Sequence, residues 1–332
     1  MRARPIPPND SGSGRTASPL LPLALSLLAA GAALTGCEDA FTRVVDVDLE
    51  DPPAEAVLYA DWSSDAEVLR VVVTETVGAL AEGLPAGTPG ARVEGFVDGV
   101  SFGVFREVDT AFVDHDFAGA APGVYYELER PDAMTPGAEA SVRVTLPDGT
   151  ELSAAGRFPP VRALEVLRYD PPRLDTTEFG NGGVSITTRA GDVAVRLRDF
   201  DPATNAYAFY AATLDSAGAA TGFRERLDGR ESDTRFAFVR EGAVLRDFSF
   251  NESDVEVTLE YFGSPPTAGA PRRVVYYEAL PEAHYLYQRD REALELAEFN
   301  PFAEPVVLPS NVEGGLGHFL LTSVSPVTPL EP

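Results

Sequence analysis

The feature that most constrains this chain is a series of short β-branched and aromatic runs bounded by glycine, proline and aspartate. The run at residues 68–77 is long enough for a central strand. Asp98-Gly99 separates two runs of alternating apolar and polar residues, which is a strong hairpin signal. Seven or so strands at a spacing of about 8–12 residues are typical of an antiparallel sandwich. We therefore predict an immunoglobulin-like β-sandwich over residues 56–160.

The second part of the chain, residues 161–332, is also predicted to be rich in β-strands. Phe158-Pro159-Pro160 marks the boundary, and Pro171-Pro172 is read as a break between strands. One α-helix is expected near 281–299, with Pro281 by its first turn. A final strand at 317–324 is expected to close this second domain. The predicted fold class is thus mostly β, with a sandwich followed by a β-rich domain that has one helix.

Cys37 is the only cysteine, and it follows an apolar stretch at 20–34 and the small residues Thr35-Gly36. Three arginines stand upstream, so the segment has the layout of a secretory signal. Ending in cysteine, it resembles a bacterial lipoprotein signal with a lipobox. We expect residues 1–36 to be removed and Cys37 to be lipidated. The stretch is shorter than the ~20 residues of a spanning helix, so acyl chains alone would anchor the protein. The alternative is a thiol that merely follows an apolar run.

Residues 37–55 are interpreted as an acidic tether that ends in proline. Glu38 and Asp39 directly follow the cysteine. Acidic residues at this place resemble the surface-export signal of Bacteroidota lipoproteins. This resemblance implies a location on the outer membrane, facing the cell exterior; the alternative is an unstructured tether without an export role.

The charge balance limits the kinds of partner. The chain has 52 acidic and 26 basic residues, a net charge of −26, and all of its basic residues are arginine. A surface this acidic repels phosphate backbones, so nucleic-acid binding is not expected.

Signals for catalysis are poor. The histidines at 115, 284 and 318 are far apart in the sequence, and neither a His-Glu-x-x-His nor a Gly-x-Ser-x-Gly motif is present. No catalytic residue, metal site or cofactor is predicted. Two carboxylates could in principle hydrolyse a glycoside, but sequence alone cannot select a pair among so many acidic residues. A hydrolase is therefore the least favoured reading.

Three phrases in the second part have a clear physical interpretation. Asp and Asn side chains readily hydrogen-bond to their own backbone, so the segment at 199–207 predicts a tight turn. The glycines in the segment at 309–319 allow positive φ or close backbone approach. The loops are read either as architecture or as one surface for a partner or ligand, with Asn300, Pro301, Phe302, Asn311, Gly314, Gly315 and Gly317 as its candidate residues. The phrases are Asp199-Phe200-Asp201-Pro202-Ala203-Thr204-Asn205-Ala206-Tyr207, Asn300-Pro301-Phe302-Ala303-Glu304-Pro305 and Pro309-Ser310-Asn311-Val312-Glu313-Gly314-Gly315-Leu316-Gly317-His318-Phe319.

On these phrases the chain resembles the domain-of-unknown-function family four-two-four-nine, over essentially everything after Cys37. Its members are Bacteroidota lipoproteins often encoded beside TonB-dependent outer-membrane receptors. The resemblance implies a non-enzymatic accessory or binding subunit of a TonB-dependent nutrient-uptake system, with the receptor as partner. The alternative is a stand-alone adhesin or interaction module.

Overall fold

The structure is a computed structural model, and it describes residues 53–77, 87–108, 123–179, 184–214, 220–229, 233–239, 242–250, 253–262, 272–297 and 306–330. Residues 52–332 group into one compact unit. The signal segment, Cys37, most of the tether and Asn300-Pro301-Phe302 lie outside the described residues. Among the helices of the described part, none is both long and apolar enough to cross a bilayer.

The amino-terminal part has the strand order of an immunoglobulin-like sandwich. One sheet runs β5-β6-β2-β1 and the other β4-β3-β7-β8. Lettered in chain order, these are D-E-B-A and C′-C-F-G, which is the immunoglobulin arrangement. The predicted fold class is confirmed. The strands are β1 (Ala56–Ser63), β2 (Val68–Glu75), β3 (Arg92–Val97), β4 (Val100–Val104), β5 (Arg106–Val108), β6 (Val124–Glu129), β7 (Glu139–Thr145) and β8 (Glu151–Arg157).

The hairpin predicted from Asp98-Gly99 is present between β3 and β4. Asp98 has a φ of 48° and Gly99 a φ of 77°. Positive φ at both central residues is the requirement of a type I′ turn, which matches the twist of the two strands.

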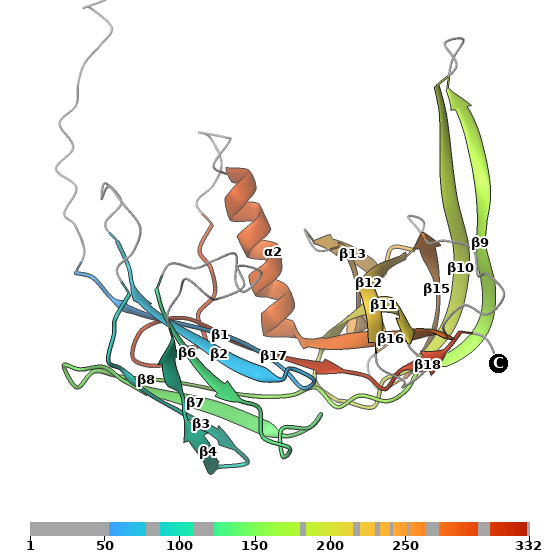
Figure 1. The fold of residues 1–332 in the computed structure, drawn as a ribbon. Coiled ribbons are helices and arrows are strands. Elements are labelled where there is room, and N and C mark those ends of the chain that lie inside the picture. The colour runs from blue at the N-terminus through green and yellow to red at the C-terminus, as the bar shows by residue number, and fades with distance from the viewer. Residues whose placement is uncertain are drawn as a thin grey trace, which may run out of the picture. The chain divides into compact units, whose positions relative to one another are not determined.

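A strand from the end of the chain extends the sandwich. This strand, β17 (Leu316–Val324), runs parallel to β1 (Figure 1), from the pair Val57–Leu316 to the pair Ser63–Thr322. The sequence predicted a strand here, but placed it in the second domain. The physical reason for its position is the burial of Phe319 and Leu321, which join the hydrophobic core of the sandwich.

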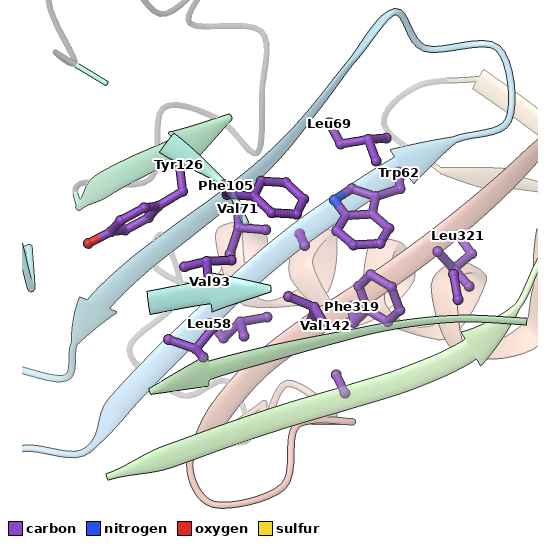
Figure 2. Packing of buried hydrophobic residues seen from close by; sticks show 14 of the residues in the cluster. Leu58, Trp62, Leu69, Val71, Val93, Phe105, Tyr126, Val142, Phe319 and Leu321 are labelled. Carbon is purple, nitrogen blue, oxygen red and sulfur yellow. The ribbon is translucent and has the colours of Figure 1, made fainter. Parts of the chain in front are cut away.

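Trp62 lies at the centre of that core and is fully buried (Figure 2). Its ring stacks on Phe105 at 5.7 Å and meets the edge of Phe319 at 4.8 Å between centroids. The indole N–H donates to the carbonyl of Arg70 at 3.0 Å, so the buried polar atom is satisfied. The tryptophan thus joins strands from both ends of the chain.

Beyond β17 the sheet continues through β16, β11, β12, β15, β10 and β9. Leu164 and these strands form a second hydrophobic cluster, separate from the sandwich core, which includes Phe158. The cores therefore change over near the boundary predicted from Phe158-Pro159-Pro160, while the domain limits remain predictions. The elements are β9 (Glu165–Phe179), β10 (Val184–Arg198), β11 (Asn205–Leu214), β12 (Ala220–Gly229), β13 (Phe236–Val239), β14 (Gly242–Arg246), the 3-10 helix η2 (Asp247–Ser249), β15 (Asp254–Phe262), β16 (Arg272–Pro281), the helix α2 (Glu282–Ala297) and β18 (Thr328–Pro329).

Pro171-Pro172 does not break the chain as predicted. Both prolines lie inside β9, which is the terminal strand of the sheet and is paired only with β10 in the described part. The register shifts between Ala190 and Asp192, so Gly191 faces the proline pair in a bulge. Proline lacks a backbone N–H group. It is tolerated here because an edge strand has no partner on one side and a bulge leaves residues unpaired.

The predicted helix is confirmed as α2, although its buried face differs from the sequence pattern. The helical spacing of the sequence puts Leu286 and Leu294 on one face. The buried residues are instead His284, Tyr285 and Tyr287, all in the first two turns. Pro281 is the last residue of β16, paired with Asn205, and not part of the helix.

Candidate binding groove

The glycine-rich loop before β17 is packed against the sandwich. Gly317 has a φ of 119°, and a Cβ there would lie 1.9 Å from the carbonyl oxygen of Leu58. Gly314 has a φ of 82°, and its Cβ would lie 2.2 Å from the oxygen of Glu151. Close backbone approach explains these glycines, because any side chain would push the loop off β1 and β8. A Cβ at Gly315 would likewise lie 2.5 Å from the carbonyl oxygen of Ala56.

Asn311 fixes the same loop by pairing with the backbone of β17. Its Nδ2 donates to the carbonyl of Phe319 at 2.8 Å, and the Phe319 N–H donates to Oδ1 at 2.7 Å. Two residues on, the N–H groups of Glu313 and Ser153 each donate to the other's carbonyl, at 2.8 and 3.0 Å. The loop therefore bridges β17 and β8, and its outer side faces solvent.

A groove of about 440 Å³ lies beside this loop, over the outer face of β3, β7 and β8. Its floor consists of small side chains, because the register places Ser141 opposite Ala155 and Arg143 opposite Ser153. Larger side chains stand on either side of this floor, Phe96 and Arg143 on one and Glu313 on the other. The volume is within the usual range for ligand sites. The described lining residues are Phe96, Gly99, Ser141, Val142, Arg143, Ser153, Ala154, Ala155, Asn311 and Glu313.

One wall carries an arginine on an aromatic ring. The guanidinium carbon of Arg143 lies 5.3 Å from the centroid of Phe96. Glu94 is directly opposite Arg143 on β3, but its carboxylate accepts from Arg92 at 3.0 Å and from Ser101 at 2.7 Å. These hydrogen bonds also lower the pKa of Glu94, that from Ser101 most. Glu94 is therefore ionised and already committed to other donors.

The structure relates the sequence-predicted residues to this groove in different ways. Asn311 lines it, whereas Gly314, Gly315 and Gly317 hold the loop behind it in place. Asn300, Pro301, Phe302 and the lipidation residue Cys37 lie outside the described residues. Sequence reasoning did not single out the remaining lining residues. The alternation of β7 was the available signal, since buried Val142 and Val144 leave Ser141 and Arg143 on the outer face.

A second polar cluster is buried beneath α2. It brings together two histidines that the sequence keeps apart. His318 on β17 packs between Tyr59 and Tyr287, with ring centroids at 4.8 and 3.9 Å. Nδ1 of His284 lies 3.4 Å from the hydroxyl of Thr322, and within the described part of the chain Nδ1 of His318 has no hydrogen-bond partner. Burial lowers the pKa of His318 to about 3, and His284 and Arg291 act in the same direction.

A third polar cluster surrounds the segment at 199–207, and its hydrogen bonds confirm the tight turn that was predicted there. Asn205 Nδ2 donates to the Ala203 carbonyl at 2.9 Å and to Asp201 Oδ2 at 3.3 Å. Asp247 is fully buried, and its Oδ2 accepts from the Asn205 N–H at 2.7 Å. Burial raises the pKa of Asp247 to about 6, and the Asp199 carboxylate adds to the shift. In the described part of the chain, no three His, Cys, Asp or Glu side chains are placed to share a metal ion.

Comparison with known proteins places the chain in a family. The model of the family described as "Domain of unknown function (DUF4249)" matches residues 42–326, and the chain belongs to that family. The search of curated proteins found no match. Among solved structures, the chain is similar to "Enterococcal surface protein, partial N-terminal region", at 10% identity over 71% of this chain and 92% of that one. Its TM-score of 0.16 is too low to support any argument.

Proposed function

We propose that this protein is a lipid-anchored lipoprotein on the outer face of the outer membrane, acting as a non-enzymatic binding subunit of a TonB-dependent nutrient-uptake system. The observation that carries the binding role is the groove over β3, β7 and β8, where an arginine and a carboxylate stand on opposite walls above a floor of small residues. The anchor is supported by the signal-like segment before Cys37. The receptor partnership is what the resemblance to the family implies.

The charges in the groove favour binding over hydrolysis. Glycoside hydrolysis commonly uses two carboxyl groups on either side of the scissile bond. The groove pairs one guanidinium, on Arg143, with one carboxylate, on Glu313. Such a pair orients a ligand by its charges, but does not supply the acid and the base or nucleophile of that reaction.

Lipidation is tested by replacing the cysteine. Cys37→Ala is expected to leave the protein soluble after cell fractionation, because no acyl chain can be attached. The unchanged chain should partition with the outer membrane and be degraded when protease is added to intact cells. Membrane retention of Cys37→Ala, together with an unaltered circular dichroism spectrum, would contradict the anchor.

The receptor partnership is tested by affinity purification from native membranes in mild detergent, followed by mass spectrometry. A TonB-dependent barrel in near-stoichiometric amount is the expected result. A protein that is exposed on the surface but carries no barrel would replace this proposal with the stand-alone adhesin.

A further inference from the structure

The groove has a positive wall that lacks an ion pair of its own. Two other arginines of the sandwich form close ion pairs, Arg70 with Glu127 at 2.8 Å and Arg92 with Glu94 at 3.0 Å. In the described part of the chain no ion pair within 4 Å joins Arg143 to a carboxylate. Glu94 feels the charge of Arg143 but is hydrogen-bonded to Arg92 and Ser101. A guanidinium fork is well suited to a carboxylate, which it can bind through two parallel hydrogen bonds.

The facing wall carries the opposite charge. Glu313 is exposed and follows Asn311 in the loop that bridges β8 and β17. Among the described residues, the side-chain contact of its Oε2 is a long hydrogen bond from the hydroxyl of Ser153, at 3.5 Å. The remaining acceptor positions of this carboxylate point to a ligand with an N–H donor, an ammonium group above all.

The distance between the walls sets the length of the ligand. Arg143 is paired with Ser153, and Ser153 in turn with Glu313, so two strand spacings separate the charged residues. Two spacings are roughly 10 Å, and the tilt of Arg143 over Phe96 increases the separation of the charged heads. An extended peptide covers about 3.3–3.6 Å per residue, so about three to four residues fit.

The charge of the whole chain selects among ligands with a carboxylate. A net charge of −26 disfavours the approach of anions. A zwitterion has no net charge, and it gains from both walls at once. The floor of Ser141, Ser153 and Ala155 leaves room for a backbone while offering two hydroxyls for hydrogen bonds.

We infer that the groove binds a short linear peptide with free termini, its carboxylate on Arg143 and its ammonium group on Glu313. This inference rests on the proposed binding function and specifies its ligand class.

The test is isothermal titration calorimetry of the full chain in mild detergent with tetra-alanine, its N-acetyl form and its C-terminal amide. Free tetra-alanine is expected to bind at least about tenfold more tightly than either capped form, since each cap removes one charged contact. Equal affinity of all three peptides would overturn the inference, and so would tighter binding of a capped form.

Two variants assign the ends of the peptide. Arg143→Gln should abolish the preference for the free carboxylate but keep that for the free amine, and Glu313→Gln should do the reverse. Arg168→Gln is the control, because this arginine on β9 is exposed and paired with Asp170, away from the groove. Loss of both preferences in one variant, at an unchanged melting temperature, would contradict the assigned orientation.

The outcomes separate the ligand from the function. A lipidated, surface-exposed protein that purifies with a barrel but binds no peptide would overturn the inference and leave the proposed function intact. A protein that binds the peptides as described but is found without a lipid anchor or barrel would overturn the proposed function alone.

Discussion

The two outer faces of the sandwich are used in different ways. On the sheet that contains β1 and β17, Tyr287 of α2 packs on His318, which in turn packs on Tyr59, and the groups in contact are uncharged rings. On the opposite sheet Ser141 and Arg143 face a groove, and the charged side chains reach solvent. The difference shows that one face joins distant parts of the chain, whereas the other leaves its polar side chains open to solvent.

The largest loss of stability is expected from adding a side chain at Gly317, where the pairing of β17 with β1 leaves no room for one. Gly317→Ala should reduce the free energy of unfolding by more than about 3 kcal/mol, because the new Cβ would overlap the Leu58 carbonyl at a φ that disfavours alanine. Urea unfolding measures the loss.

Gly99→Ala is the matched control for this change. Gly99 also has a positive φ, but a Cβ there meets nothing within 4 Å. A loss of only about 1 kcal/mol is expected, from backbone strain alone. Equal losses at both glycines would show that close approach to Leu58 is not what demands glycine at Gly317.

Acid should weaken the covered face next. The pKa of His318 is about 3 in the folded protein, against 6.5 in the unfolded chain. As pH falls below 6.5 the unfolded state takes up the proton first, so stability is lost by up to about 1.4 kcal/mol per pH unit until about pH 3. His318→Phe keeps a ring between Tyr59 and Tyr287 and should lack this slope. Unfolding free energies of both proteins at pH 7 and 4.5 give the comparison, and parallel curves would refute it.

A smaller effect is expected where the two faces meet. Asn311→Ala removes both hydrogen bonds to the Phe319 backbone, which should cost about 2 kcal/mol. Asn311→Asp keeps the acceptor for the Phe319 N–H and should lose about half as much. Should thermal unfolding place both variants within 0.5 °C of the parent, the loop would not depend on this pairing.

The smallest effect on stability is expected on the open face. Arg143→Gln should change the free energy of unfolding by less than about 0.5 kcal/mol, because the side chain is exposed and lacks an ion pair in the described structure. Chemical denaturation of the parent and the variant tests this, and a loss above about 1 kcal/mol would give Arg143 a structural role.

Local signals in the sequence were enough for all of the sandwich strands but β5 and for the Asp98-Gly99 turn, since each depends on neighbouring residues. Four of the described strands were not predicted, namely β5, β12, β14 and β18. In β12 the four charged residues between Arg224 and Asp228 hide the alternation of apolar and polar residues, although Leu227 among them is buried. Arg226 lies over the ring of Tyr210 and donates to its hydroxyl at 3.0 Å, a contact that the sequence does not indicate. The short strand β14 has no alternating pattern at all, since three successive residues within it are buried.

Contacts between distant segments could not be derived from local pattern. The parallel pairing of β17 with β1 joins residues some 260 positions apart, and nothing near His318 indicates Tyr59 as its neighbour. The groove depends on the same pairing, because it brings Asn311 and Glu313 to the side of β8. Asn311 was therefore named as a candidate from its loop, while Arg143, Phe96 and the serines were not.

The position of β17 also sets an order of events during synthesis. Ala60 and Trp62 pair with Phe319 and Leu321, so the sandwich lacks a strand and part of its core until nearly the whole chain has been delivered. The amino-terminal half must therefore wait, incompletely folded, for the last segment. A chain that stops before residue 316 leaves the backbone edge of β1 unpaired, and such an edge is a template for pairing with another chain.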